Sequence, residues 1–412
     1  MNAEITGSKQ DTAQPLEAFS SVFEKVALFA LVTWSSIMAY QMAASGIRHD
    51  YAAYVEQWSH VLAGGDPWVL SGIPFNAYGP VHTFLAFSAI PSFLVPKFIF
   101  GLGIIWLNLI LVMLLLKATP RPRLHIWVAY LLLIPLNFLV IGAVFLFGNN
   151  DALVAALIGF GVLARFRGFA VTAGMLFGLA ILLKFYPLLL LPFLTLHDRR
   201  FNLRVLASAL GVVLIGFTIT TLRWGTSFIN AISGGIEREA TILSILNYLR
   251  EAGISEGTYE ALLGINTIAV VLMTGALFLV VWLFRIHWLV GASIAMLLLA
   301  TVYKVGHQQF LLTWLVLLAC LLVMGPRSTR PAVFIAMPLV LGLSAFQYGF
   351  VQAWNEGVFW DEPGTFLRVT ASLIFFILSA ITIVTSLLMS IHQNHTSRAL
   401  AEPSAPKQAA TL

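Results

Sequence analysis

The chain has 412 residues, of which 59% are apolar and only 10% are charged, and its formal net charge is +5. Soluble proteins have roughly 25% charged residues, so this composition excludes a soluble globular protein and predicts an all-α polytopic membrane protein. Because Cys320 is the single cysteine, an internal disulfide and a multi-cysteine zinc site are excluded. We attribute the positive charge to loops that flank the membrane. The lipid bilayer is therefore an expected partner, and nucleic acid is not.

Residues 1–24 are polar and predict a cytoplasmic N-terminal tail, and residues 392–412 predict a disordered cytoplasmic C-terminal tail. Between them, residues 25–391 predict one transmembrane domain. About twelve crossings (11 to 13) are expected, because a span needs about 20 apolar residues. The apolar runs start near residues 26, 98, 126, 151, 168, 187, 205, 265, 288, 309, 332 and 367.

Loop charges predict how the spans are oriented. If the proline-broken segment 81–97 does not cross the bilayer, eleven basic residues fall in one set of loops with a single acid, Asp198. The acidic residues collect in the other set. The positive-inside rule then makes the basic loops cytoplasmic. The second half of the pair 168–185 and 187–196 is too short for a full span, so these two segments are predicted to form a bent or re-entrant pair.

The first outer loop, 48–97, begins with HDY and continues through GGDPW to Tyr78-Gly79-Pro80. Tyr51, Tyr54 and Trp58 repeat at helical spacing, which is typical of an interfacial amphipathic helix with Asp50 as a solvated first residue. A second interpretation makes Asp50 a general base at the floor of an outer cavity. His60, Glu56, Asp66 and His82 are interpreted as solvated or capping groups.

Three further polar breaks fall on the same predicted side. In GNND (148–151), Gly148 ends one helix and Asn150 or Asp151 caps the next, with a cavity contact as the alternative role. In KFYP (184–187), Lys184 either extends to headgroups or binds a phosphate. In KVGHQQ (304–309), Lys304 and His307 would share a face if the segment were helical. Breaks that meet at one depth predict a cavity at the outer membrane boundary.

The second long outer loop, 224–264, mixes charged and apolar positions at helical spacing. It is either a lid of interfacial helices over the cavity or an ordinary solvated loop. Arg238 and Arg250 are its candidates for contacting an anion. Neither a clustered set of metal ligands nor a nucleotide-binding loop is found in the sequence, so no metal and no cofactor is expected.

These motifs resemble those of the polyprenyl-phosphate-dependent glycosyltransferases of the GT-C superfamily. The nearest resemblance is to the α-mannosyltransferases that include the phosphatidylinositol-mannoside and lipomannan enzymes (glycosyltransferase family 87). It rests on the Asp-Tyr after the first span, on WSHVLAGGDPW and AYGP, and on GNNDALVAAL, LAILLKFYPLLLLP and HQQF. Together these motifs extend from about residue 48 to 310.

The resemblance implies a GT-C bundle in the plasma (bacterial inner) membrane with its active site facing the periplasm or cell exterior. It implies transfer of a sugar, first of all mannose, from a polyprenyl-phosphate donor to a hydroxyl of a glycolipid or glycan acceptor, with inversion. Asp50 matches the general base, and Lys184, Lys304 and His307 match positions near the donor phosphate. The further cavity or substrate contacts are Tyr51, Tyr54, Tyr78, Asn150, Asp151, Tyr186 and Gln308.

Two departures from the family pattern bear on the substrate. Tyr78-Gly79-Pro80 stands where the family often has Tyr-Pro-Pro, and the loop near SILNYL lacks an Asn-Gln-Ser motif. Two other functions remain open: a lipid-linked saccharide flippase or transporter, and a polysaccharide polymerase or ligase. A transporter favours polar residues at mid-span and two related halves, and a polymerase favours arginine-rich outer loops. The sequence has neither feature.

Overall fold

Helices make up most of the computed structural model, which describes residues 14–69, 76–118, 123–197, 199–241, 243–358 and 362–401. A helix occupies each of the twelve predicted apolar runs. Seven are long and apolar enough to cross a membrane: Val22–Ala44, Val95–Ala118, Leu124–Leu146, Leu203–Trp224, Glu256–Leu283, Arg327–Ala353 and Thr365–Asn394. The chain is therefore an α-helical multi-pass membrane protein, as the composition predicted, and the count of twelve crossings stays a prediction.

The first half of the chain supplies α1 and a group of short elements before α4. The elements are α1 (Gln14–Ala44), α2 (Asp50–Leu62), α3 (Pro80–Phe84), η1 (Leu85–Ala89), α4 (Val95–Ala118), α5 (Leu124–Leu133), α6 (Phe138–Val140), η2 (Ile141–Leu146), α7 (Asp151–Phe166) and α8 (Ala170–Leu183). Residues 81–94 hold only two five-residue turns of helix, α3 and η1, ahead of α4. That segment 81–97 does not cross the bilayer stays a prediction.

The second half begins with the short apolar pair η3 (Tyr186–Leu190) and α9 (Leu191–Thr195). A two-residue antiparallel ladder of β1 (Leu196–His197) and β2 (Arg200–Phe201) follows, with Leu196 opposite Phe201. The remaining elements are α10 (Leu203–Trp224), α11 (Ile229–Glu237), α12 (Ile245–Glu251), α13 (Glu256–Leu283), α14 (Trp288–Val302), η4 (Gln308–Phe310), α15 (Leu311–Met324), η5 (Arg327–Thr329), α16 (Arg330–Asn355) and α17 (Glu362–Ala401).

Several predicted boundaries differ from the observed ones. α1 begins at Gln14 rather than near residue 25, and α17 continues to Ala401, so residues 392–401, predicted to be disordered, are helical. The remaining parts of both tails, 1–13 and 402–412, lie outside the described residues. α4 begins at Val95 and α13 at Glu256, so the last residues of both predicted outer loops are helical. The cause is the same in each case, since helices extend past the apolar run into polar flanks.

Short helices form the buried centre of the bundle and longer ones its exterior. All but the last residue of α15 is buried, and α15 packs against α7 and α14. The outer helices expose large apolar side chains, among them Phe29, Leu222 and Ile268, at 65% to 83%. Exposing so many large apolar side chains to water would be unfavourable, whereas lipid acyl chains can surround them without that penalty. Five of the apolar helical segments, α7, α8, η3–α9, α14 and η4–α15, are 17 residues or shorter.

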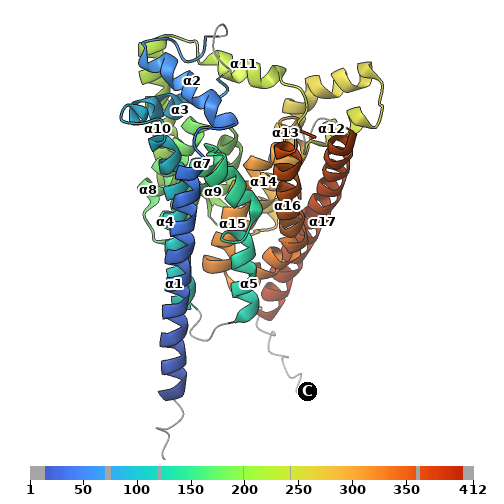
Figure 1. The fold of residues 1–412 in the computed structure, drawn as a ribbon. Helices are drawn as coiled ribbons and strands as arrows, with labels where there is room; N and C mark the ends of the chain where they lie inside the picture. Colours follow the sequence, from blue (N-terminus) through green and yellow to red (C-terminus); the bar gives the residue numbers. More distant parts are fainter. Residues whose placement is uncertain are drawn as a thin grey trace, which may run out of the picture.

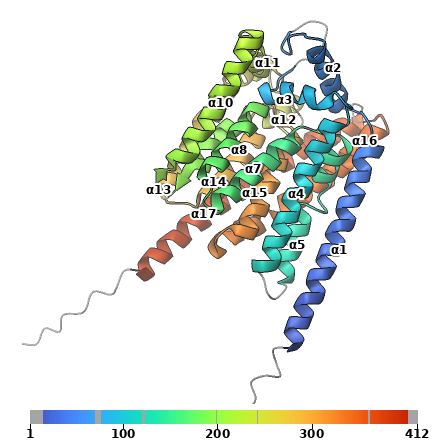
Figure 2. The same ribbon diagram turned by 90° about the vertical axis from the view of Figure 1, so that its left-hand side faces the viewer.

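The polar elements gather at one end of the bundle. In Figure 1, α2, α11 and α12 lie at the top, while α1 starts and α17 ends toward the bottom. The view turned by 90° gives the same division (Figure 2). The two ends of the described chain therefore lie on the same side of the bundle, opposite α2.

Candidate functional site

A strained turn positions Asp50 at the first residue of α2. Gly46 and His49 both have positive φ, 63° and 52°, and His49 immediately precedes the helix. A buried lysine of α4 holds this turn in place. Lys97 Nζ donates to Ser45 Oγ at 2.6 Å, to the Gly46 carbonyl at 2.9 Å and to the Leu146 carbonyl at 3.1 Å. The Asp50 side chain itself is exposed, in the first turn of α2.

α2 is amphipathic, as the spacing of its aromatics predicted. Its buried side chains are Tyr51, Tyr54, Gln57, Trp58 and Val61. The Tyr51 hydroxyl donates to the Phe93 carbonyl at 2.5 Å and accepts from the Lys97 backbone N–H at 2.9 Å. Tyr51 is thus a structural support for the loop, and neither hollow described below includes it.

A buried polar network connects α2 to the start of α7. The Tyr54 hydroxyl donates to Asn150 Oδ1 at 3.2 Å, and the Tyr78 hydroxyl donates to that of Tyr54 at 3.3 Å. His82 lies between Gln57 Oε1 (3.0 Å) and Asn150 Nδ2 (3.2 Å). Since the Asn150 amide can only donate, His82 Nδ1 accepts and Nε2 donates. Burial, together with the charge of Lys184, lowers the pKa of His82 to about 3, so the imidazole is neutral.

This network corrects two sequence interpretations. His82 was interpreted as solvated or capping, but it is fully buried and organises the network. Asn150 precedes α7 but makes no capping bond with its side chain, which is used in the network instead.

Asp66 does cap its turn, since its Oδ1 accepts from the Trp68 N–H at 2.9 Å. Gly148 has a φ of 68° at the end of its helix, as expected.

The KFYP and GNND motifs meet in a buried ion pair. Lys184 Nζ lies 2.5 Å from Asp151 Oδ2, and the side chains are 7% and 0% exposed. Lys184 Nζ also lies 5.0 Å from the centre of the Tyr78 ring and 5.2 Å from that of Phe310. Asp151 Oδ1 is buried with no hydrogen-bond partner among the described residues. Asp151 begins α7, where the helix dipole favours its negative charge.

The KVGHQQ segment is not helical until Gln308, so Lys304 and His307 do not share a helix face. The chain after α14 folds back closely on it at Gly306, where a Cβ would lie 2.7 Å from the Ala300 carbonyl oxygen, so this position has no room for a side chain. The segment instead pairs with the loop before α12, because the Thr241 N–H donates to the Lys304 carbonyl at 2.8 Å and the Leu243 N–H to Gly306 at 3.2 Å. Lys304 is buried, and it lines neither hollow described next.

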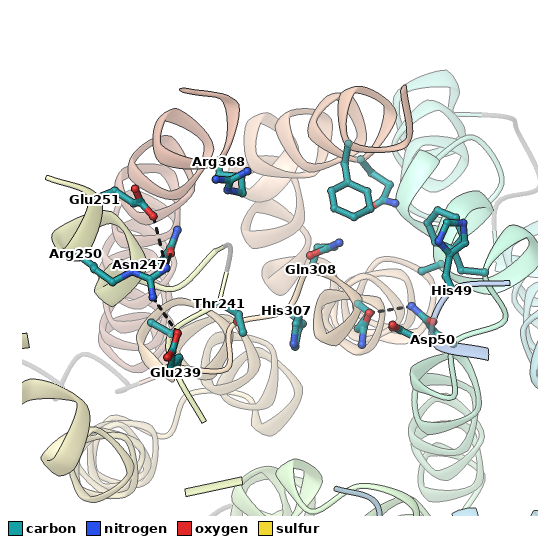
Figure 3. A pocket seen from close by; sticks show the side chains of 17 residues that line it. His49, Asp50, Glu239, Thr241, Asn247, Arg250, Glu251, His307, Gln308 and Arg368 are labelled. Atoms are coloured by element: carbon teal, nitrogen blue, oxygen red, sulfur yellow. Dashed lines mark hydrogen bonds and ion pairs between the residues drawn. The ribbon is translucent and has the colours of Figure 1, made fainter. Parts of the chain in front are cut away.

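Two hollows meet at Asp50. The first, about 510 Å³, lies between α2, α12, α16 and α17; Figure 3 shows Asp50 on one side, Arg250 and Glu239 on the other, and His307 between. The second, about 390 Å³, is lined by Tyr78, Lys184, Phe185, Tyr186, Arg238 and Phe310 among others. Asp50, His307 and Gln309 line both. They therefore mark the junction of the two.

The two hollows differ in chemistry. The second has two cations, Lys184 and Arg238, with Asp50 as its one acid. The first mixes charges of both signs with five side-chain amides: Asn149, Asn247, Gln308, Gln309 and Gln347. Arg250 there is already paired, with Glu239 at 3.1 Å and Glu251 at 3.5 Å.

His307 is neutral where the hollows join. Burial, with the charges of Arg238 and Lys184 adding to it, lowers the pKa of His307 to about 3. Its ring contacts that of Phe310, with centroids 6.1 Å apart. A bound anion would offset the two cations and raise this pKa.

The predicted residues thus fall into three groups. Asp50, Tyr78, Lys184, Tyr186, His307 and Gln308 line the hollows. Tyr54, Asn150 and Asp151 lie behind them in the buried network. Tyr51 and Lys304 neither line a hollow nor belong to the buried network behind the hollows. Gln309, part of the predicted KVGHQQ break, also lines both hollows, and its Oε1 accepts from Asn149 Nδ2 at 2.9 Å. Sequence reasoning did not single out the amides of Asn149, Asn247 and Gln347 as lining residues.

No family model matches the chain, and a comparison with curated proteins finds no match either. Among the described residues, no group of three or more His, Cys, Asp or Glu side chains could hold a metal ion. The site therefore has to be interpreted from its own geometry.

Proposed function

We propose that this chain is a membrane glycosyltransferase that uses a polyprenyl-phosphate-linked sugar, first of all mannose, as donor. The acceptor is a hydroxyl of a glycolipid or glycan, and the reaction takes place at the outer face of the plasma membrane. One observation carries the proposal: the exposed carboxylate of Asp50 lies where a cationic hollow joins a hollow rich in side-chain amides.

The cationic hollow suits the donor phosphate. Arg238 supplies positive charge, Lys184 supplies an ammonium that it shares with Asp151, and Phe185, Ile232 and Val305 supply apolar walls for a lipid-borne group. Electrostatic stabilisation of a leaving phosphate is the largest help that such a reaction can receive from the protein. His307, as a neutral imidazole, can donate a hydrogen bond to the phosphate through its ring N–H.

The amide-rich hollow suits a saccharide acceptor, because amides offer both donors and acceptors to sugar hydroxyls. At the junction, Asp50 takes the proton of the attacking hydroxyl. The hydroxyl oxygen bonds to the anomeric carbon, and the bond from that carbon to the phosphate oxygen breaks. A single displacement of this kind inverts the anomeric configuration, so a β-linked donor yields an α-glycoside.

The decisive assay uses purified protein, polyprenyl-phosphate mannose and a mannoside acceptor. Asp50→Asn keeps the shape of the side chain but removes the base, so transfer is expected to fall about 100-fold or more. Glu56→Gln is the matched control, since Glu56 is an exposed carboxylate on the same helix, and it should retain the wild-type rate. Undiminished transfer by Asp50→Asn would remove Asp50 from the role of base.

The donor site is tested separately. Lys184→Ala leaves Asp151 as an unpaired buried charge, which destabilises the fold by itself. The double variant Lys184→Met with Asp151→Asn removes both charges, so it should fold yet still transfer mannose poorly. A folded double variant with normal turnover would contradict a phosphate-binding role for Lys184. Turnover abolished by a chelator would contradict the expected independence from divalent metal.

A further inference from the structure

A third hollow lies at the end of the bundle away from Asp50. It encloses about 450 Å³. Its walls come from the last turn of α7, from β1, from the end of α13, from the start of α14 and from the end of α17. Figure 2 shows α17 running toward the end of the bundle opposite to α2 and α11. The glycosyltransferase proposal makes no use of this hollow.

The charged side chains among its described lining residues are all basic. Among its lining residues are three arginines and two histidines: Arg165, Arg199, Arg285, His197 and His287. None of the lining residues is acidic. Asp198, the one acid in the neighbouring sequence, lies outside the described residues. A hollow with three arginines and no carboxylate among its described lining residues favours an anionic ligand.

Two of the arginines are fixed in place by backbone carbonyls. Arg165 lies over the Trp288 ring, with its guanidinium carbon 3.9 Å from the ring centre, and donates to the carbonyls of Leu194 and Leu196. Arg199 donates to the Leu283 carbonyl at 2.6 Å and to that of Trp282 at 3.1 Å. These bonds keep both charges at the hollow without neutralising either.

The third arginine remains available. Arg285 is exposed and its guanidinium has no hydrogen bond or ion pair within the described chain. Its backbone is held, however: φ is 55°, and Asn394 Nδ2 donates to the carbonyls of Phe284 and Arg285 at 3.0 and 3.1 Å. A strained turn held by a second helix presents a guanidinium that has no partner among the described residues, which is suited to bidentate binding of a phosphate.

Neutral donors and a helix end complete the wall. His287 precedes the 15-residue helix α14, whose N-terminal end lies at the hollow, and His287 Nδ1 accepts from the Leu289 N–H at 3.3 Å, so one N–H of this end is capped from within the chain. Ser328, Thr329 and Gln393 also line it. Helix N-termini favour phosphates, and the arginines supply the charge that a helix end alone lacks. Apolar walls from Phe166, Val281 and Ile286 provide for a hydrophobic part of the ligand.

We propose that this hollow is a binding site for a phosphate ester, separate from the candidate active site. The phosphate could belong to the headgroup of an anionic lipid in the leaflet at this end, or to a soluble phosphorylated molecule. Basic pockets between membrane helices on the positive side are suited to anionic headgroups. The two sources share one chemistry and differ in whether acyl chains contribute.

Binding is measured on the full-length protein in neutral detergent. The probes are dihexanoyl phosphatidylglycerol, its headgroup without acyl chains (glycerophosphoglycerol), and dihexanoyl phosphatidylcholine. Arg285→Ala should raise the Kd for phosphatidylglycerol about tenfold, the effect of losing a charged hydrogen-bond pair. Arg285→Lys should raise it less, since the charge remains without the planar fork. Both substitutions are at an exposed side chain, so folding is expected to be preserved.

Arg204→Ala is the control, because Arg204 is an exposed arginine in the first turn of α10 that does not line the hollow. It should leave the Kd unchanged within about twofold. Tighter binding of phosphatidylglycerol than of its headgroup supports the lipid source, and equal binding supports the soluble one. The proposal fails if neither anionic probe binds more tightly than phosphatidylcholine, or if Arg204→Ala weakens binding as much as Arg285→Ala.

Discussion

At the scale of single residues, the site depends on charges that are expensive to bury. Lys184 and Asp151 offset one another at 2.5 Å, yet a buried ion pair often contributes little net stability compared with apolar residues of the same shape. The pair also leaves Asp151 Oδ1 without a partner among the described residues. A costly arrangement at the wall of a hollow is typical of a functional site.

His82 gives a pH dependence that can be measured. Its pKa is about 3 in the folded protein and 6.5 in the unfolded chain, so the native state binds fewer protons between these values. Stability is therefore complete above pH 6.5 and falls as the pH decreases toward 3. Between pH 6.5 and 4.5, this residue alone should cost about 2–3 kcal/mol, which is about 1.4 kcal/mol per pH unit.

The measurement compares apparent melting temperatures in detergent at pH 7 and pH 4.5. His82→Gln removes the titrating group, so its melting temperature should fall less on acidification than that of the wild type. His125→Gln, at an exposed position, should fall as much as the wild type. Equal losses in wild type and His82→Gln would contradict a buried, neutral His82.

At the scale of elements, α2 is placed by a lysine on another helix. Lys97 lies in the first turn of α4, is fully buried and bonds to Ser45, Gly46 and Leu146. It thus joins the end of α1, the end of η2 and the start of α4. The turn that leads to Asp50 is consequently fixed from outside its own sequence.

Lys97→Met should therefore loosen this turn. Loss of three charge-assisted hydrogen bonds from a buried site is expected to cost about 3 kcal/mol or more and to lower the rate of transfer along with the apparent melting temperature. Lys117→Met provides the control, because Lys117 is exposed in the last turn of the same helix. If both variants melted and reacted alike, Lys97 would have no special role in placing α2.

At the scale of the whole molecule, the two ends of the bundle differ in chemistry. Asp50, Glu239 and Arg250 lie at one hollow, while Arg165, Arg199 and Arg285 lie at another, at the opposite end. The positive-inside rule predicts that the arginine end faces the cytoplasm. The sidedness can be tested with cysteines, because the native Cys320 is fully buried and can be replaced by alanine.

In that background, Glu239→Cys should react with an impermeant maleimide in intact cells, and Arg204→Cys only in inside-out vesicles. Both positions are exposed, so a difference in labelling reports the side of the membrane rather than burial. Labelling of both cysteines from the same side would contradict the orientation. It would also remove the reason to expect the candidate active site at the outer face.

By itself, the sequence determined the class of the protein and the location of its helices. Apolar runs and loop charges are local properties, so the bilayer imposes them on every segment separately. Helix ends were less certain, as α1 and α17 show, because a helix continues into polar residues while its hydrogen bonds and packing allow.

Only the tertiary structure decided which polar residues work together. Asp151 and Lys184 come from different motifs, and nothing in either motif specifies a pair. The sequence predicted a solvated or capping His82, but the fold buries it between Gln57 and Asn150. It predicted that Lys304 and His307 would share a face if their segment were helical, but the chain is not helical between Val302 and Gln308. A buried polar group needs a hydrogen-bond partner, and the tertiary packing around it determines which residue that partner is. A pattern along one segment cannot supply that information.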